Sequence, residues 1–177
     1  MNEAVRNLGK LWGAALVTAL LVTPAFAQSD PELLPADQAG MEQCLQFASE
    51  RGTRPEECLG LVQDPCMDSE EGQSTAGSVA CIAREHAYWD RLLNQSYGRL
   101  RENGDDLANR SLRDLQRQWL AWRQARCAFE AAQFEGGTYA NVVANLCFTS
   151  ETARRAIDLT GMLPDGEDPF RLEPADQ

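Results

Sequence analysis

The sequence predicts an all-α protein: a small antiparallel helical bundle, stapled by disulfides and preceded by a short N-terminal helical hairpin. Apolar residues recur at helical spacing in three long segments, and no segment shows sustained alternation of apolar and polar residues. Six cysteines follow the N-terminal apolar segment, and three of them lie in the long helical segments. Short connections between successive long helices favour antiparallel neighbours, which gives the bundle.

The first long helix is predicted from about residue 79. One stripe of its surface carries apolar residues at steps of seven, four, four and three: Ile82, Trp89, Leu93, Tyr97 and Leu100. Ser78 is the expected cap, and Gly104 is the expected left-handed terminator.

Two further helices follow. The second is predicted from Asn109 or Ser111 to Gln133, and the third from Tyr139 or Asn141 to Leu159. The apolar residues of the second helix recur at steps of three, four and three, at Leu112, Leu115, Trp119 and Trp122. The two glycines of the intervening segment interrupt the pattern, so an interhelical turn is expected there.

Ahead of these helices, residues 41–60 suggest a helical hairpin that turns at residues 51–54, with Pro55 suited to a helix first turn. Residues 64–78 are polar and contain glycine and serine, so a loop is expected. Together with the three long helices, these segments form one predicted domain over residues 41–162, a usual size for a single core.

The start of the chain resembles a signal peptide. Arg6 and Lys10 precede an apolar run over residues 11–24, and Ala25 and Ala27 occupy the positions that a signal peptidase inspects. Cleavage after residue 27 is therefore predicted, and a periplasmic or secreted location with it. The competing interpretation is a membrane anchor, which needs about 20 apolar residues. Since the run is shorter, no stable anchor is expected after cleavage.

Two segments at the edges of the domain are predicted to lack fixed structure. Residues 28–40 contain two prolines and no periodic apolar face, so they are expected to form a flexible leader. Residues 163–177 have the same character and are expected to form a disordered acidic tail.

The mature chain is strongly acidic. Removal of residues 1–27 changes the formal charge from −11 to −12 and leaves no lysine. Binding to nucleic acid or to anionic lipid is not expected, because both are recognised by cationic patches. A basic protein partner would be attracted, although acidity can equally serve solubility alone.

The six cysteines are expected to form a disulfide framework, since an even number in a small exported chain is typical of one. We predict the sequential pairs Cys44 with Cys58, Cys66 with Cys81, and Cys127 with Cys147. Each closes a loop of about 15 to 20 residues, for which the chain-entropy model gives roughly 3 kcal/mol. Structural zinc is the alternative, but no CxxC spacing supports it, and no metal or cofactor is expected.

The aromatic residues Trp89, Tyr97, Trp119 and Trp122 are interpreted as core, with a sugar-stacking platform as the alternative for the tryptophans. Arginines 117, 123 and 155 are interpreted as structural, paired with carboxylates such as Asp90, Glu130 or Glu151. Ligand binding is the alternative for these arginines.

These residues, at these spacings, resemble the N-terminal domain of the LprI-type lysozyme inhibitor family. The match runs over about residues 81–159 and includes three cysteines, the tryptophan and arginine pattern of the second helix, and the glycine pair of the turn. Its residues are Cys81, Asp90, Leu93, Asn94, Tyr97, Leu100, Gln116, Arg117, Trp119, Trp122, Arg123, Cys127, Gly136, Gly137, Cys147, Thr152, Arg155 and Leu159. Gln124 departs from the pattern, which usually has an acidic residue there.

The resemblance implies an exported, non-enzymatic helical protein, in some members an inhibitor of wall-degrading muramidases. The partner would be a cationic lysozyme-like hydrolase. The first candidate contact is the turn, with Glu135, Gly136, Gly137, Thr138 and Tyr139; the second is the acidic segment with Asp68, Glu70 and Glu71. The glycines can also be explained by a tight interhelical turn that needs positive φ.

Enzymatic function is not predicted. His86 and Asp90 lie one helical turn apart, but no nucleophile motif, phosphate loop or metal signature accompanies them, so a solvent-facing helix histidine is expected. The alternative to inhibition is a periplasmic scaffold that binds an envelope protein without inhibiting an enzyme. Salt-sensitive binding to lysozyme separates the two.

Overall fold

The computed structural model describes residues 33–164 and 168–174. Within these residues the chain is all-α, as predicted, with five α-helices, two short 3₁₀ helices and no strand. The elements are α1 (Pro35–Arg51), η1 (Pro55–Cys58), α2 (Gln63–Asp68), η2 (Glu70–Gly72), α3 (Thr75–Asn103), α4 (Asp106–Ala132) and α5 (Tyr139–Thr160). None of the described helices is long and apolar enough to cross a bilayer. The predicted signal peptide lies outside the described residues.

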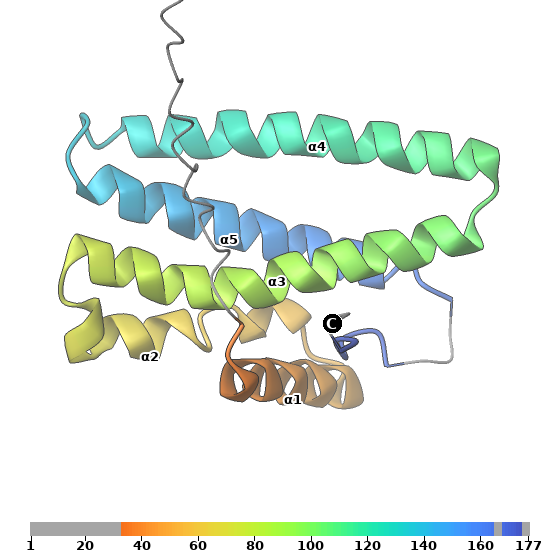
Figure 1. Cartoon of the computed structure of the whole chain (residues 1–177), viewed down its shortest axis with the longest axis horizontal. Helices are drawn as coiled ribbons and strands as arrows, with labels where there is room; N and C mark the ends of the chain where they lie inside the picture. The colour runs from red at the N-terminus through yellow and green to blue at the C-terminus, as the bar shows by residue number, and fades with distance from the viewer. Residues whose placement is uncertain (1–32, 165–167, 175–177) are drawn as a thin grey trace, which may run out of the picture.

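The centre of the molecule is the pair α3 and α5, which pack along their lengths (Figure 1). Helix α4 runs antiparallel to α5 and packs mainly on it, with few contacts to α3. Helices α1 and α2 lie on the other side of α3, and η1 reaches α5. The three long helices of the prediction are therefore confirmed as neighbours, with α5 between α3 and α4.

Side-chain caps fix where two of the long helices begin. The hydroxyl of Ser74 accepts a hydrogen bond from the Gly77 amide at 2.9 Å, and the Asp105 carboxylate accepts one from the Ala108 amide at 2.8 Å. Both helices thus begin before the predicted residues, since a cap oxygen satisfies an amide that the helix leaves unpaired. Gly104 ends α3 with φ −94°, so the expected left-handed terminator is wrong.

Around Trp89 and Tyr88, which are fully buried, the core joins α1, α3 and α5. Met41 and Leu45 enter it from α1, and Leu159 enters it from α5. The disulfides are the three predicted pairs, Cys44–Cys58, Cys66–Cys81 and Cys127–Cys147. They tie η1 to α1, α2 to α3, and α4 to α5.

The N-terminal part is more helical than the sequence suggested. Helix α1 begins at Pro35, so residues 35–40 are not a flexible leader; the fixed φ of proline suits a first helical turn. The second arm of the expected hairpin is only the 3₁₀ turn η1, and the expected loop over residues 64–78 contains α2, η2 and the start of α3.

The described end of the chain, residues 168–174, is not disordered, and we call it the C-terminal strap. Phe170 and Leu172 are buried in the core between α1 and α3. The Tyr88 hydroxyl donates to the Phe170 carbonyl at 2.8 Å, and the Leu172 amide donates to the Glu42 carboxylate at 3.0 Å. Two apolar side chains and these hydrogen bonds hold the strap against the helices.

Candidate protein-docking site

The connection between α4 and α5, residues 134–138, forms a tight turn that we call, together with Tyr139, the α4–α5 tip. Glu135 and Gly136 both have positive φ, 48° and 74°. The Gly137 amide donates to the Phe134 carbonyl at 3.0 Å, which closes the turn. Gly136 therefore supplies the conformation expected of it, whereas Gly137 has no positive φ, and a non-glycine residue, Glu135, adopts one instead.

The tip presents aromatic rings and a carboxylate to solvent. Phe134 is 42% exposed and Tyr139 is 55% exposed, and their ring centroids lie 5.4 Å apart in an edge-to-face arrangement. Glu135 is exposed beside them, and a Cβ added to Gly136 would meet nothing within 4 Å. Phe134 belongs to this surface although sequence reasoning missed it; its position beside the turn was the available signal.

Cysteines at the base of the tip hold it in place. The disulfide Cys127–Cys147 joins the last turns of α4 to the first turns of α5, and both cysteines are buried. A surface anchored in this way loses little conformational entropy when it binds a partner. The tip therefore combines two exposed rings and one acid on a turn that a disulfide anchors.

The second candidate group, Asp68, Glu70 and Glu71, forms an exposed acidic patch at the end of α2 and in η2. Its backbone is tightly packed: a Cβ on Gly77 would lie 1.9 Å from the Glu71 carbonyl oxygen. Nearby, Arg84 makes two hydrogen bonds to Asp37, at 2.9 and 3.0 Å, and lies 3.9 Å from Glu71. Arg84 therefore pairs mainly with Asp37 and only weakly with Glu71, so the patch keeps its negative charge.

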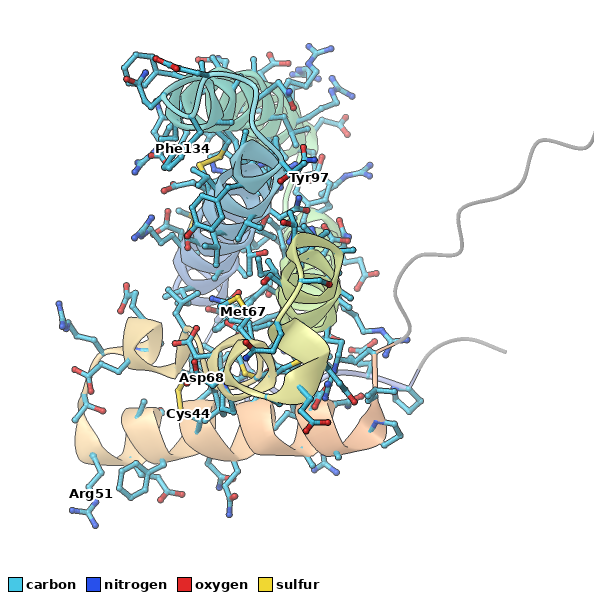
Figure 2. The ribbon with its side chains drawn as sticks, turned by 90° about the vertical axis from the view of Figure 1, so that its left-hand side faces the viewer. Cys44, Arg51, Met67, Asp68, Tyr97 and Phe134 are labelled. Atoms are coloured by element: carbon cyan, nitrogen blue, oxygen red, sulfur yellow. A yellow bond between two sulfur atoms is a disulfide. The ribbon has the colours of Figure 1, made fainter. Side chains whose placement is uncertain are left out.

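The tip and the acidic patch lie at the same end of the molecule, where α4 turns into α5 and α2 leads into α3 (Figure 1). Figure 2 faces this end and shows Phe134 towards one edge and Asp68 towards the other. They do not form one cluster, because neither α2 nor η2 contacts α4 or α5 in the described part of the chain. A partner that covers this end would meet both.

The aromatic residues that were expected in the core divide into three kinds. Trp89 is fully buried, whereas Tyr97 and Trp119 are half-buried and pack against the core. Trp122 is 49% exposed, with the Arg126 guanidinium 5.4 Å from its ring, so its assignment to the core is wrong. Helix α4 packs mainly on α5, and Trp122 lies outside that contact.

The arginines make other contacts than those expected. Arg123 donates to the Thr152 hydroxyl at 2.6 Å and stacks on Trp119, and Arg155 donates to the Gln116 side chain at 3.0 Å. Neither forms an ion pair with a described residue. Glu130 and Glu151 pair instead with Arg126, at 3.1 Å each. The predicted carboxylate network around Arg123 and Arg155 is therefore wrong.

Glu85 is a structural residue that sequence reasoning missed. Its carboxylate is fully buried and accepts four hydrogen bonds, from the amides of Gly60, Val62 and Gln63 and from the indole of Trp89, at 2.9 to 3.1 Å. It fastens the segment between η1 and α2 to α3. The available signal was its place within the apolar stripe, three residues after Ile82 and four before Trp89.

His86 is not the solvent-facing residue that was expected. It is partly buried against α5, with its Nδ1 atom 3.5 Å from the Thr149 hydroxyl, and burial lowers its pKa below the ordinary 6.5. The charge of Asp90 opposes this shift, and Arg123 adds to it. No group of three or more potential metal ligands occurs among the residues that the structure describes.

The fold and its exposed tip define a disulfide-stapled helical module with two exposed aromatic rings at one end. Residues 66–159, just over half of the chain, match the family model described as lysozyme inhibitor LprI, and the chain belongs to this family. The match begins at Cys66 rather than at Cys81, so it includes the acidic patch and the Cys66–Cys81 disulfide. No curated protein and no solved structure gave a match.

Proposed function

We propose that this protein is an exported inhibitor that binds a cationic lysozyme-like hydrolase with the α4–α5 tip and covers its cleft. The observation that carries the proposal is the tip itself, two exposed rings and an acid on a turn whose base is fixed by Cys127–Cys147. Tyrosine and other aromatic side chains at the centre of an interface supply much of its binding energy. Membership of a lysozyme inhibitor family supports the same function.

Charge supports the proposed partner. The whole chain carries −11, and the same end of the molecule presents Glu135 and the acidic patch. Complementary charge raises the association rate of a basic partner, whereas buried anchors determine how long the complex lasts. We assign the first role to the acids and the second to Phe134 and Tyr139.

The proposed location is the periplasm or the medium. Three disulfides form and persist in oxidising compartments, and the predicted signal peptide would deliver the chain there. The proposal includes no catalytic step, because in the described residues His86 is half-covered by α5 and no metal-binding cluster accompanies it.

The test is lysis of cell walls by lysozyme with and without the oxidised protein, together with calorimetry at two salt concentrations. Tyr139→Ala should raise Kd about 30-fold, as expected for an anchor worth about 2 kcal/mol. Glu135→Gln should raise Kd roughly threefold to tenfold and reduce its salt dependence.

The matched control is Glu102→Gln, which removes the same charge from an exposed residue at the other end of α3 (Figure 1). It should leave inhibition within about twofold, since rim or remote charges contribute little. Equal losses in Glu135→Gln and Glu102→Gln would show that diffuse charge, not the tip, attracts the enzyme. Absence of both binding and inhibition would favour the scaffold hypothesis.

A further inference from the structure

A second feature of the molecule is a crevice between α3 and α4, with a volume of about 270 Å³, which we call the arginine crevice. Three arginines line it, Arg113, Arg117 and Arg123, whereas Asp90 is the only acidic residue of its lining. Trp119 contributes an aromatic wall. In a chain with a net charge of −11, this concentration of positive charge needs an explanation.

Arg123 at the inner side of the crevice is incompletely paired. Its Nη1 atom donates to Thr152, and its guanidinium lies 4.6 Å from the centre of the Trp119 ring and 5.4 Å from that of Phe148. Its Nε atom is buried and has no hydrogen-bond partner among the described residues. A partly buried cation without a direct ion pair is costly, and an anion bound in the crevice would reduce that cost through its charge, without contact to the buried Nε atom.

The other two arginines lie at the mouth. Arg117 pairs with Asp114 at 2.7 Å on the exposed surface, while Arg113 forms no ion pair within the described ranges. Asp90, the single acid, already accepts a hydrogen bond from the Asn94 amide at 2.9 Å. The crevice thus has more cationic donors than its own carboxylate can satisfy.

We propose that the arginine crevice binds a small ligand that carries a carboxylate. Arg113 and Arg117, one helical turn apart on α4, would hold the carboxylate, because the planar guanidinium matches its two oxygens, and the charge of Arg123 would add to their attraction. The ring of Trp119 would cover the body of the ligand. The volume suits one sugar or one or two amino acids, so the carboxylate comes from an acidic amino sugar or from the end of a short peptide.

The test uses the oxidised protein with three probes: N-acetylmuramic acid, its neutral counterpart N-acetylglucosamine, and N-acetylalanine. Binding is followed by calorimetry and by the indole N–H signals in heteronuclear NMR spectra. At least one of the two carboxylates should bind and shift the Trp119 indole signal, while that of the buried Trp89 stays in place. Whichever carboxylate binds more tightly identifies the source, and the neutral sugar should not bind.

Two variants make the site specific. Arg113→Gln should weaken binding of the preferred carboxylate about tenfold, the usual effect of losing a hydrogen bond to a charged group. Arg110→Gln removes the same charge from an exposed position of the same helix outside the crevice and should change affinity by less than twofold.

Three results would overturn the proposal. The first is that neither carboxylate binds at 20 mM, a concentration that corresponds to a binding free energy of about −2 kcal/mol. The others are equal binding of the neutral sugar and an equal loss of affinity in the two arginine variants. The inhibition assay is independent of this test, because residues 113–123 lie apart from the α4–α5 tip.

Discussion

Replacing Glu85 by glutamine tests how the segment between η1 and α2 is held. Each oxygen of the carboxylate accepts two hydrogen bonds, Oε1 from Gly60 and the Trp89 indole, Oε2 from Val62 and Gln63. An amide keeps one oxygen and turns an N–H₂ group towards two other donors. The variant therefore loses two of the four bonds wherever the amide points.

The variant should lose about 3 to 5 kcal/mol of unfolding free energy. Each of the two lost hydrogen bonds to a charged group contributes about 1.5 to 3 kcal/mol, and the sum is reduced because a neutral side chain costs less to bury than a carboxylate. The assay is urea denaturation of the oxidised protein followed by circular dichroism. Amide hydrogen exchange should accelerate in parallel, at Val62 and Gln63 when the nitrogen replaces Oε2, or at Gly60 when it replaces Oε1. The exposed variant Glu102→Gln is the control and should change stability by less than about 0.5 kcal/mol.

A loss below about 1 kcal/mol in Glu85→Gln would refute this reasoning, because two hydrogen-bond donors in this interior site cannot lose their acceptor at so small a cost. Unchanged exchange at all three amides, Gly60, Val62 and Gln63, would refute it as well. A large loss without faster exchange at these amides would place the effect in the packing of Trp89.

Two further predictions concern the histidine and the strap. Burial lowers the pKa of His86, so the unfolded chain binds its proton more readily and stability should rise from pH 5 to pH 7; His86→Gln should flatten this rise in urea titrations, and an unchanged slope would contradict it. Tyr88→Phe leaves the buried Phe170 carbonyl unpaired and should cost about 1 to 3 kcal/mol. Trypsin should then cleave faster after the exposed Arg171, and an unaltered rate would show that the hydroxyl does not hold the strap.

The sequence predicts the three long helices well, because each carries an apolar stripe that packs against a neighbouring helix of the same bundle. The stripe through Trp89 and Leu93 is buried as expected. The predicted sequential cysteine pairs are confirmed, although spacing alone does not determine them, since Cys66 is nearer along the chain to Cys58 than to its partner Cys81. The helices depend on local pattern and short loops, which sequence periodicity records.

The features that were missed depend on distant contacts. Phe170 and Leu172 are two apolar residues in an acidic, proline-containing tail, and only their contacts with the folded helices make them core. Trp122 and Trp119 lie three residues apart on α4, yet only Trp119 packs against the core. For the candidate site, the turn and its glycines were predictable, whereas the ring pair of Phe134 and Tyr139 required the backbone geometry at Glu135.

Along the sequence, the first cysteine is joined to the second, the third to the fourth and the fifth to the sixth. When a chain crosses a membrane from its N-terminus, the two members of every native pair emerge together, before a member of the following pair appears. An oxidant that links cysteines in their order of arrival therefore produces the native set directly. Such a chain would need little help from enzymes that reshuffle disulfides, whose uncatalysed rearrangement takes minutes to hours.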